Sequence, residues 1–153
     1  MRTRTKRAVA LASIVGLVSL IPLGQAIAGG PTTLNAVLTG AAEVPGPGDS
    51  NGTGNAQIVL DPPNEVCFDV DWDGIGRPVA AHIHRGGPAK AGPVRVELFA
   101  SSRPLPRTIS GVQGCVRNVD TALVDAIIAT PAKFYVNVHT RAYPDGAIRG
   151  QLA

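Results

Sequence analysis

The chain has 153 residues, with 14 Lys and Arg residues, 11 Asp and Glu residues, three histidines and two cysteines. Four of the basic residues lie within the first 28 positions, which leaves 10 basic against 11 acidic residues in the remainder. A nearly neutral chain without a basic patch excludes nucleic-acid binding and attraction to an anionic membrane as its main function.

Residues 1–28 have the three-part pattern of a secretory signal peptide. The basic segment Arg2–Arg7 precedes the apolar run Ala8–Ile21, and the small-x-small sequence Ala26-Ile27-Ala28 follows. The apolar run is shorter than the roughly 20 residues that span a bilayer, which argues against a membrane anchor. No cysteine follows the run, so a lipoprotein anchor is unsupported. We expect a cleaved signal peptide, a secreted or extracytoplasmic protein and no transmembrane segment after cleavage.

Residues 29–153 are enough for a single domain, and no linker long enough to divide them is present. Short alternating segments are separated by Gly, Pro and Asp residues, as in an antiparallel β-sandwich. The strands predicted from this pattern are 34–39, 56–60, 65–73, 79–84, 94–99, 134–140 and 147–152. The polar segment 43–54 is expected to be an exposed loop.

One segment has helical rather than strand spacing. Asp120 is a candidate N-cap and Pro131 a stop signal. The apolar residues at helical spacing between these two signals are Val119, Leu123, Val124, Ile127 and Ile128. The sequence therefore predicts a mainly β fold, an antiparallel Greek-key β-sandwich with one short helix.

The two cysteines are Cys67 and Cys115. In an oxidising compartment an isolated pair most often forms a disulfide, and two free buried thiols are the alternative. We expect the disulfide, which requires that the two segments lie side by side.

The segment 65–73 places Asp69, Asp71 and Asp73 on one face of a strand. Their spacing resembles the start of an EF-hand calcium loop, but the twelfth position is Ala80 instead of a carboxylate. A solvated strand face is the interpretation that the pattern favours.

The three histidines are His82, His84 and His139, each on a predicted strand. Side chains two residues apart on a strand point to the same side, so His82 and His84 lie opposite Ile83. His139 likewise lies opposite the core residues Val136 and Val138. If the strands are neighbours, the three imidazoles are candidate ligands for one copper or zinc ion. The alternative is that they hydrogen-bond to loop backbone and support the loops.

Several segments, in the same order, resemble the CHRD domain, the repeated domain of chordin. They are Leu38–Pro45, Ala81–Gly86, Gly92–Phe99, Phe134–Thr140 and Pro144–Leu152. The resemblance implies a secreted single-domain protein. Chordin itself is a much larger extracellular antagonist that binds growth factors, and that activity is not implied for this chain.

The histidine pattern is also similar to the copper half of copper–zinc superoxide dismutases, which are Greek-key β-sandwiches with a disulfide. On that resemblance His82, His84 and His139 match copper ligands. No histidine remains for a zinc site or a bridging imidazole. Neither Arg141 nor Arg149 can be assigned the anion-guiding role from the sequence.

The sequence contains no nucleophile elbow, phosphate loop, HExxH or CxxC motif. It favours a non-catalytic, extracytoplasmic module that binds a protein, a surface polymer or a metal ion. The alternatives are a copper-dependent redox enzyme resembling superoxide dismutase and a purely structural envelope protein.

Peptide mass mapping of the exported protein should place its new N-terminus at Gly29, because Ala26-Ile27-Ala28 meets the side-chain requirement of signal peptidase. Recovery of a membrane-embedded protein that retains residues 1–28 would contradict this prediction.

Overall fold

The computed structural model describes residues 29–153, and the signal peptide predicted over residues 1–28 lies outside them. The described chain forms eight strands, one α-helix and two short 3-10 helices. The strands are β1 (Thr32–Thr39), β2 (Thr53–Asp61), β3 (Glu65–Asp73), β4 (Pro78–Arg85), β5 (Val94–Ala100), β6 (Gly111–Val116), β7 (Phe134–Thr140) and β8 (Ile148–Gln151). The helices are η1 (Gly40–Ala42), α1 (Thr121–Ala129) and η2 (Pro131–Lys133).

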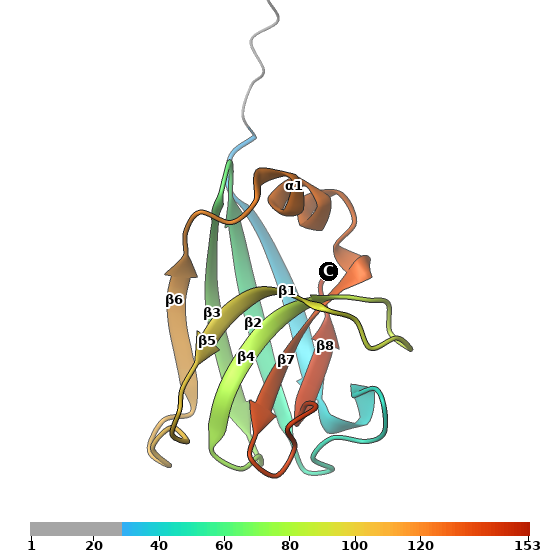
Figure 1. Ribbon diagram of the computed structural model, residues 1–153, viewed down its shortest axis with the longest axis vertical. Coiled ribbons are helices and arrows are strands. Elements are labelled where there is room, and N and C mark those ends of the chain that lie inside the picture. Colours follow the sequence, from blue (N-terminus) through green and yellow to red (C-terminus); the bar gives the residue numbers. More distant parts are fainter. Residues whose placement is uncertain (1–28) are drawn as a thin grey trace, which may run out of the picture.

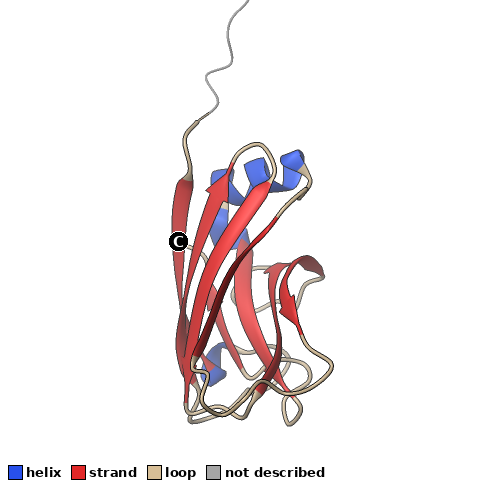
Figure 2. Ribbon diagram, turned by 90° about the vertical axis from the view of Figure 1, so that its left-hand side faces the viewer, coloured by secondary structure: helices blue, strands red, loops and turns tan. Residues whose placement is uncertain are grey.

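The strands form one sheet with the order β5-β4-β7-β8-β1-β2-β3-β6, in which all pairs are antiparallel. The sheet folds over into two layers, with β5-β4-β7-β8 in front of β1-β2-β3-β6 (Figure 1). Figure 2 shows the two layers from the side. The outer strands β5 and β6 contact each other without a hydrogen-bonded ladder, so the sheet is nearly closed. The chain passes from one layer to the other between β3 and β4 and between β6 and β7. These connections confirm the predicted Greek-key sandwich.

The core lies between the layers and follows the alternation of the strands. Along β2 and β3 every second residue is buried, as the period of two requires. The core residues of these two strands are Ala56, Ile58, Leu60, Val66, Phe68, Val70 and Trp72. Asp69, Asp71 and Asp73 on the other face of β3 are exposed, which confirms the predicted solvated face.

Helix α1 covers one end of the sandwich (Figure 1) and buries Leu123, Val124 and Ile127. Asp120 caps it, because its side chain accepts a hydrogen bond of 2.7 Å from the Ala122 amide. The helix ends before Pro131, as predicted. In the described part of the chain, no helix has the length and apolar character needed to cross a membrane.

Strand β6 was not among the strands predicted from the sequence. Gly111, Gln113 and Gly114 interrupt the apolar alternation, and none of its residues is fully buried. The predicted exposure of the segment 43–54 is wrong at Glu43, which is 7% exposed, and at three buried glycines, Gly48, Gly52 and Gly54. Local polarity identifies a loop but does not show which of its side chains the rest of the fold covers.

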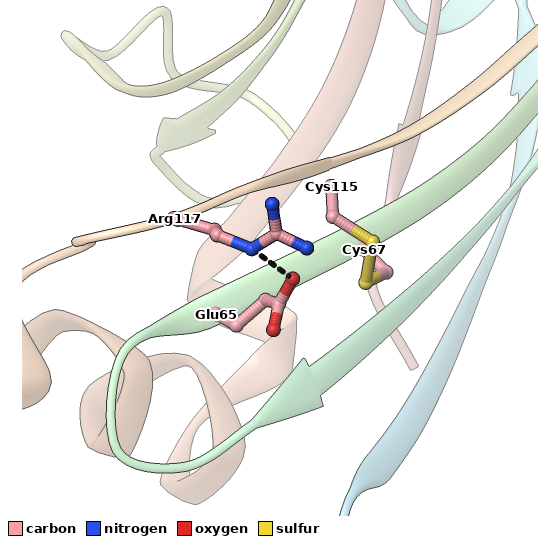
Figure 3. A network of polar contacts seen from close by, with 4 residues as sticks. All are labelled: Glu65, Cys67, Cys115 and Arg117. Atoms are coloured by element: carbon pink, nitrogen blue, oxygen red, sulfur yellow. Dashed lines mark ion pairs between the residues drawn. A yellow bond between two sulfur atoms is a disulfide. The ribbon is translucent and has the colours of Figure 1, made fainter.

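The predicted disulfide joins Cys67 and Cys115, whose Cα atoms are 3.9 Å apart. The two residues are directly opposite in the β3–β6 ladder. Figure 3 shows the bond beside an ion pair of 3.1 Å between Arg117 and Glu65. The covalent bond therefore fixes the outer strand β6, which is poor in apolar contacts, to the sheet.

Replacing both cysteines by serine (C67S/C115S) should lower the melting temperature by at least several degrees. The bond closes a loop across 48 positions, which contributes about 4 kcal/mol in the chain-entropy model. Calorimetry of the oxidised protein, the reduced protein and the variant measures this effect. Identical melting temperatures for all three would contradict the prediction.

Candidate metal centre

Strand β7 is buried along its whole length, on both faces. Phe134, Val136 and Val138 pack in the hydrophobic core. Tyr135, Asn137 and His139 point to the opposite face and are nevertheless at most 9% exposed. A buried polar layer therefore covers the outside of the front sheet. Its polar groups are stable only if they form hydrogen bonds within the protein.

The polar layer brings the three histidines together. One nitrogen from each of His82, His84 and His139 lies within 4.8 Å of the other two. The shortest separation, 3.0 Å, joins Nδ1 of His82 and Nε2 of His139. β4 and β7 are neighbours in the sheet, so the same-face orientation predicted from strand parity places the imidazoles side by side.

Two backbone carbonyls determine which nitrogens carry protons. Nδ1 of His84 lies 2.8 Å from the Gly92 carbonyl, and Nδ1 of His139 lies 2.9 Å from the Pro144 carbonyl. A carbonyl oxygen only accepts, so both Nδ1 atoms donate, and in the neutral rings each Nε2 has a free lone pair. Nε2 of His84 is buried and has no hydrogen-bond partner.

Burial lowers the pKa of all three imidazoles, because the charged form is poorly solvated in this layer. The pKa of His82 falls to about 4, and the neighbouring His139 and His84 contribute to this decrease. The three rings are therefore neutral near pH 7, which is the form that binds metal ions. His82 is the most accessible of the three and gives the cluster its contact with solvent.

The 86–93 loop between β4 and β5 covers one side of the cluster. Arg149 is 1% exposed and its Nη2 donates to the carbonyls of Gly87 and Lys90, at 2.8 and 3.2 Å. Its Cζ lies 3.4 Å from the centre of the Tyr135 ring, a cation–π contact. The ring of His84 is also stacked on Tyr135, with the two ring centroids 4.8 Å apart.

Gly92, at the end of this loop, packs too closely against the backbone to be replaced by a larger residue. A Cβ atom at this position would collide with the Arg85 carbonyl. The close approach lets the Gly92 carbonyl reach His84, and the Gly92 amide donates a hydrogen bond of 3.1 Å to the Tyr135 hydroxyl. Arg149 is thus a support for the loop, whereas Arg141 is exposed.

Glu43 is a member of the polar layer that the sequence analysis missed. Its Oε1 is buried without a hydrogen-bond partner. Burial raises the pKa of Glu43 to about 7, although the charge of Arg149 and the amide of Asn137 both act to lower it. A single carboxylate between Ala41-Ala42 and Val44-Pro45 was the available signal, but it does not by itself indicate burial.

Glu65, Cys67 and Cys115 form the other group of potential ligands in the described residues. Both sulfur atoms are consumed by the disulfide, so neither is a thiolate ligand. The histidine cluster is therefore the candidate site.

The CHRD domain family model matches residues 34–152. The chain belongs to the CHRD domain family. Comparison with curated proteins and with solved structures found no match. The CHRD match covers every described strand except the first two residues of β1.

Replacing Glu43 by glutamine (E43Q) should stabilise the metal-free protein at pH 8 and have little effect at pH 4. The folded-state pKa of Glu43 is raised from 4.5 to about 7, so the folded state binds more protons in this interval. The stability contributed by this group is fully present below pH 4.5 and is lost as the pH rises to 7. Since one pKa unit corresponds to about 1.4 kcal/mol, we expect a gain of about 3 kcal/mol at pH 8, measured by urea unfolding with a chelator present.

The matched control for this measurement is Glu97→Gln, because Glu97 is exposed. The lowered pKa of His82 has the opposite effect on stability between pH 4 and 6.5, so the variant must be compared with wild type at each pH. A difference that is the same at pH 4 and pH 8 would show that ionisation of Glu43 is not its cause.

Proposed function

We propose that this CHRD-domain protein is an exported, non-catalytic binding module that holds one copper or zinc ion through His82, His84 and His139. The observation that carries the proposal is the buried, unpartnered Nε2 of His84, which lies in a cluster with nitrogens of the other two histidines. The signal peptide expected over residues 1–28 and the disulfide support an extracytoplasmic location.

The donor atoms determine which ions fit. Three neutral imidazoles without a thiolate suit the borderline ions Cu²⁺ and Zn²⁺, whereas Ca²⁺ and Mg²⁺ prefer oxygen ligands. The hydrogen bonds from His84 and His139 to backbone carbonyls are the outer-shell contacts that fix the tautomer of metal-binding histidines. An ion about 2.0–2.1 Å from each nitrogen needs ligands roughly 3.4 Å apart. This spacing lies between the 3.0 Å that separates His82 and His139 and the 4.8 Å limit of the whole cluster.

A purely structural role explains less of the geometry. Support of the 86–93 loop uses only Nδ1 of His84, and support of the loop after β7 uses only Nδ1 of His139. Leaving Nε2 of His84 buried and unpaired costs about 1–3 kcal/mol. A bound cation removes this cost because it coordinates the free lone pair.

Titration calorimetry with Cu²⁺ and Zn²⁺ tests the proposal. We expect one ion per chain, and replacement of His84 by alanine should weaken binding by at least about 100-fold, since one of three ligands is lost. At an ion concentration 100 times its Kd, binding adds about 2.7 kcal/mol to the free energy of unfolding, so the melting temperature should rise in wild type and not in the His84 variant.

The control is Asn55→Ala, which alters the exposed face of the opposite layer. Circular dichroism of each variant verifies the fold. Absence of binding heat and of thermal stabilisation with both ions would overturn the metal-binding proposal.

A further inference from the structure

Asn137 lies beside the histidine cluster and is 2% exposed. Its Oδ1 lies 3.0 Å from Nε2 of His139. It is directly opposite His82 in the β4–β7 ladder. Its amide is also close enough to His84 to raise the pKa of that imidazole, although no hydrogen bond of ordinary length joins the two. Asn137 therefore adjoins all three histidines.

The contact between Asn137 and His139 brings two acceptors together. Nδ1 of His139 donates to the Pro144 carbonyl, so Nε2 of the neutral ring has only a lone pair. The amide oxygen of Asn137 has no proton to donate either. Two lone pairs 3.0 Å apart repel each other unless a positive group lies between or beside them. In the metal-free protein, the proton on Nδ1 of His82 fills this role, because it can be donated to Nε2 of His139.

Glu43 is a buried acidic group that neighbours Asn137. The Asn137 side chain lies close enough to the Glu43 carboxyl group to lower its pKa, the effect of an N–H group that donates to the carboxylate. The charge of Arg149 also favours the carboxylate form. An amide whose nitrogen faces Glu43 has its oxygen on the side of the histidines, where Oδ1 lies 3.0 Å from Nε2 of His139.

We propose that Asn137 is the fourth protein ligand of the site, and that its Oδ1 completes a set of three imidazole nitrogens and one amide oxygen. This inference rests on the metal-binding function proposed above. Amide and carbonyl oxygens are hard ligands, so the set favours Cu²⁺ and Zn²⁺ over the soft ion Cu⁺. The sequence pattern indicates only the three histidines as ligands, because a single asparagine on a strand carries no signal of its own.

The test compares the binding of Cu²⁺ by wild type, Asn137→Ala and Asn137→Asp, by competition with a chelator and by electron paramagnetic resonance. Alanine removes the oxygen and should weaken Cu²⁺ binding by at least about tenfold, with a changed copper spectrum. Aspartate keeps an oxygen at the same place and should bind Cu²⁺ as tightly as wild type or more tightly. Asn55→Ala, at an exposed asparagine of β2, is the matched control.

Each outcome decides between the two proposals. If wild type binds Cu²⁺ and the alanine variant binds it equally well with the same spectrum, the assignment of Asn137 is overturned and the three-histidine site stands. If both Asn137 variants lose affinity alike, its role is packing, and the assignment is again overturned. If the alanine variant does not fold, retained affinity and an altered oxygen-ligand spectrum in the aspartate variant support it, and lost affinity overturns it. If wild type does not bind Cu²⁺ or Zn²⁺, the metal-binding function itself fails.

Discussion

The burial of β7 on both faces is the constraint on which the site depends. One face carries Phe134, Val136 and Val138 into the core, as in any strand of a sandwich. The other face carries Tyr135, Asn137 and His139 into a second buried layer, where water is not available to hydrate them. Polar groups in such a layer are stable only if other groups of the protein satisfy them. Neighbouring strands and loops supply those partners: carbonyls from two loops, the rings of β4 and the guanidinium of Arg149.

Arg149 connects the 86–93 loop, which covers the site, to strand β7, which carries two of its polar side chains. It lies opposite Asn137 in the β7–β8 ladder, and it reaches across Tyr135 to the carbonyls of the 86–93 loop. The same loop provides the Gly92 carbonyl that orients His84. A side chain on β8 therefore fixes, through the loop, the direction in which an imidazole on β4 points. A lysine at position 149 would lack both the planar contact with Tyr135 and the forked donors.

The sequence predicts those features that depend on local periodicity. Strand alternation places His82, His84 and His139 on the non-core side, and the helix follows from Asp120, the apolar spacing and Pro131. It does not predict features that arise from distant contacts. Glu43 and Arg149 each belong to segments whose local composition indicates an exposed loop or an ordinary strand, and burial comes only from the packing of β7, β8 and the loops around them. β6 was missed because its place in the sheet depends on pairing with β3 and on the disulfide instead of on its own apolar pattern.

The buried polar atoms that lack a hydrogen-bond partner are concentrated in the polar layer. Among the described residues, the buried side-chain atoms without a hydrogen-bond partner are Oε1 of Glu43, Nε2 of His84 and Nη1 of Arg149. All three belong to this layer, and each costs about 1–3 kcal/mol. Together they cost about 3–9 kcal/mol, which is a large fraction of the stability of a domain of this size. Replacing such groups by apolar side chains of similar shape is nearly neutral or stabilising, so support of a loop does not require them. A cation at the site proposed above satisfies the lone pair of His84 that the fold leaves unpaired.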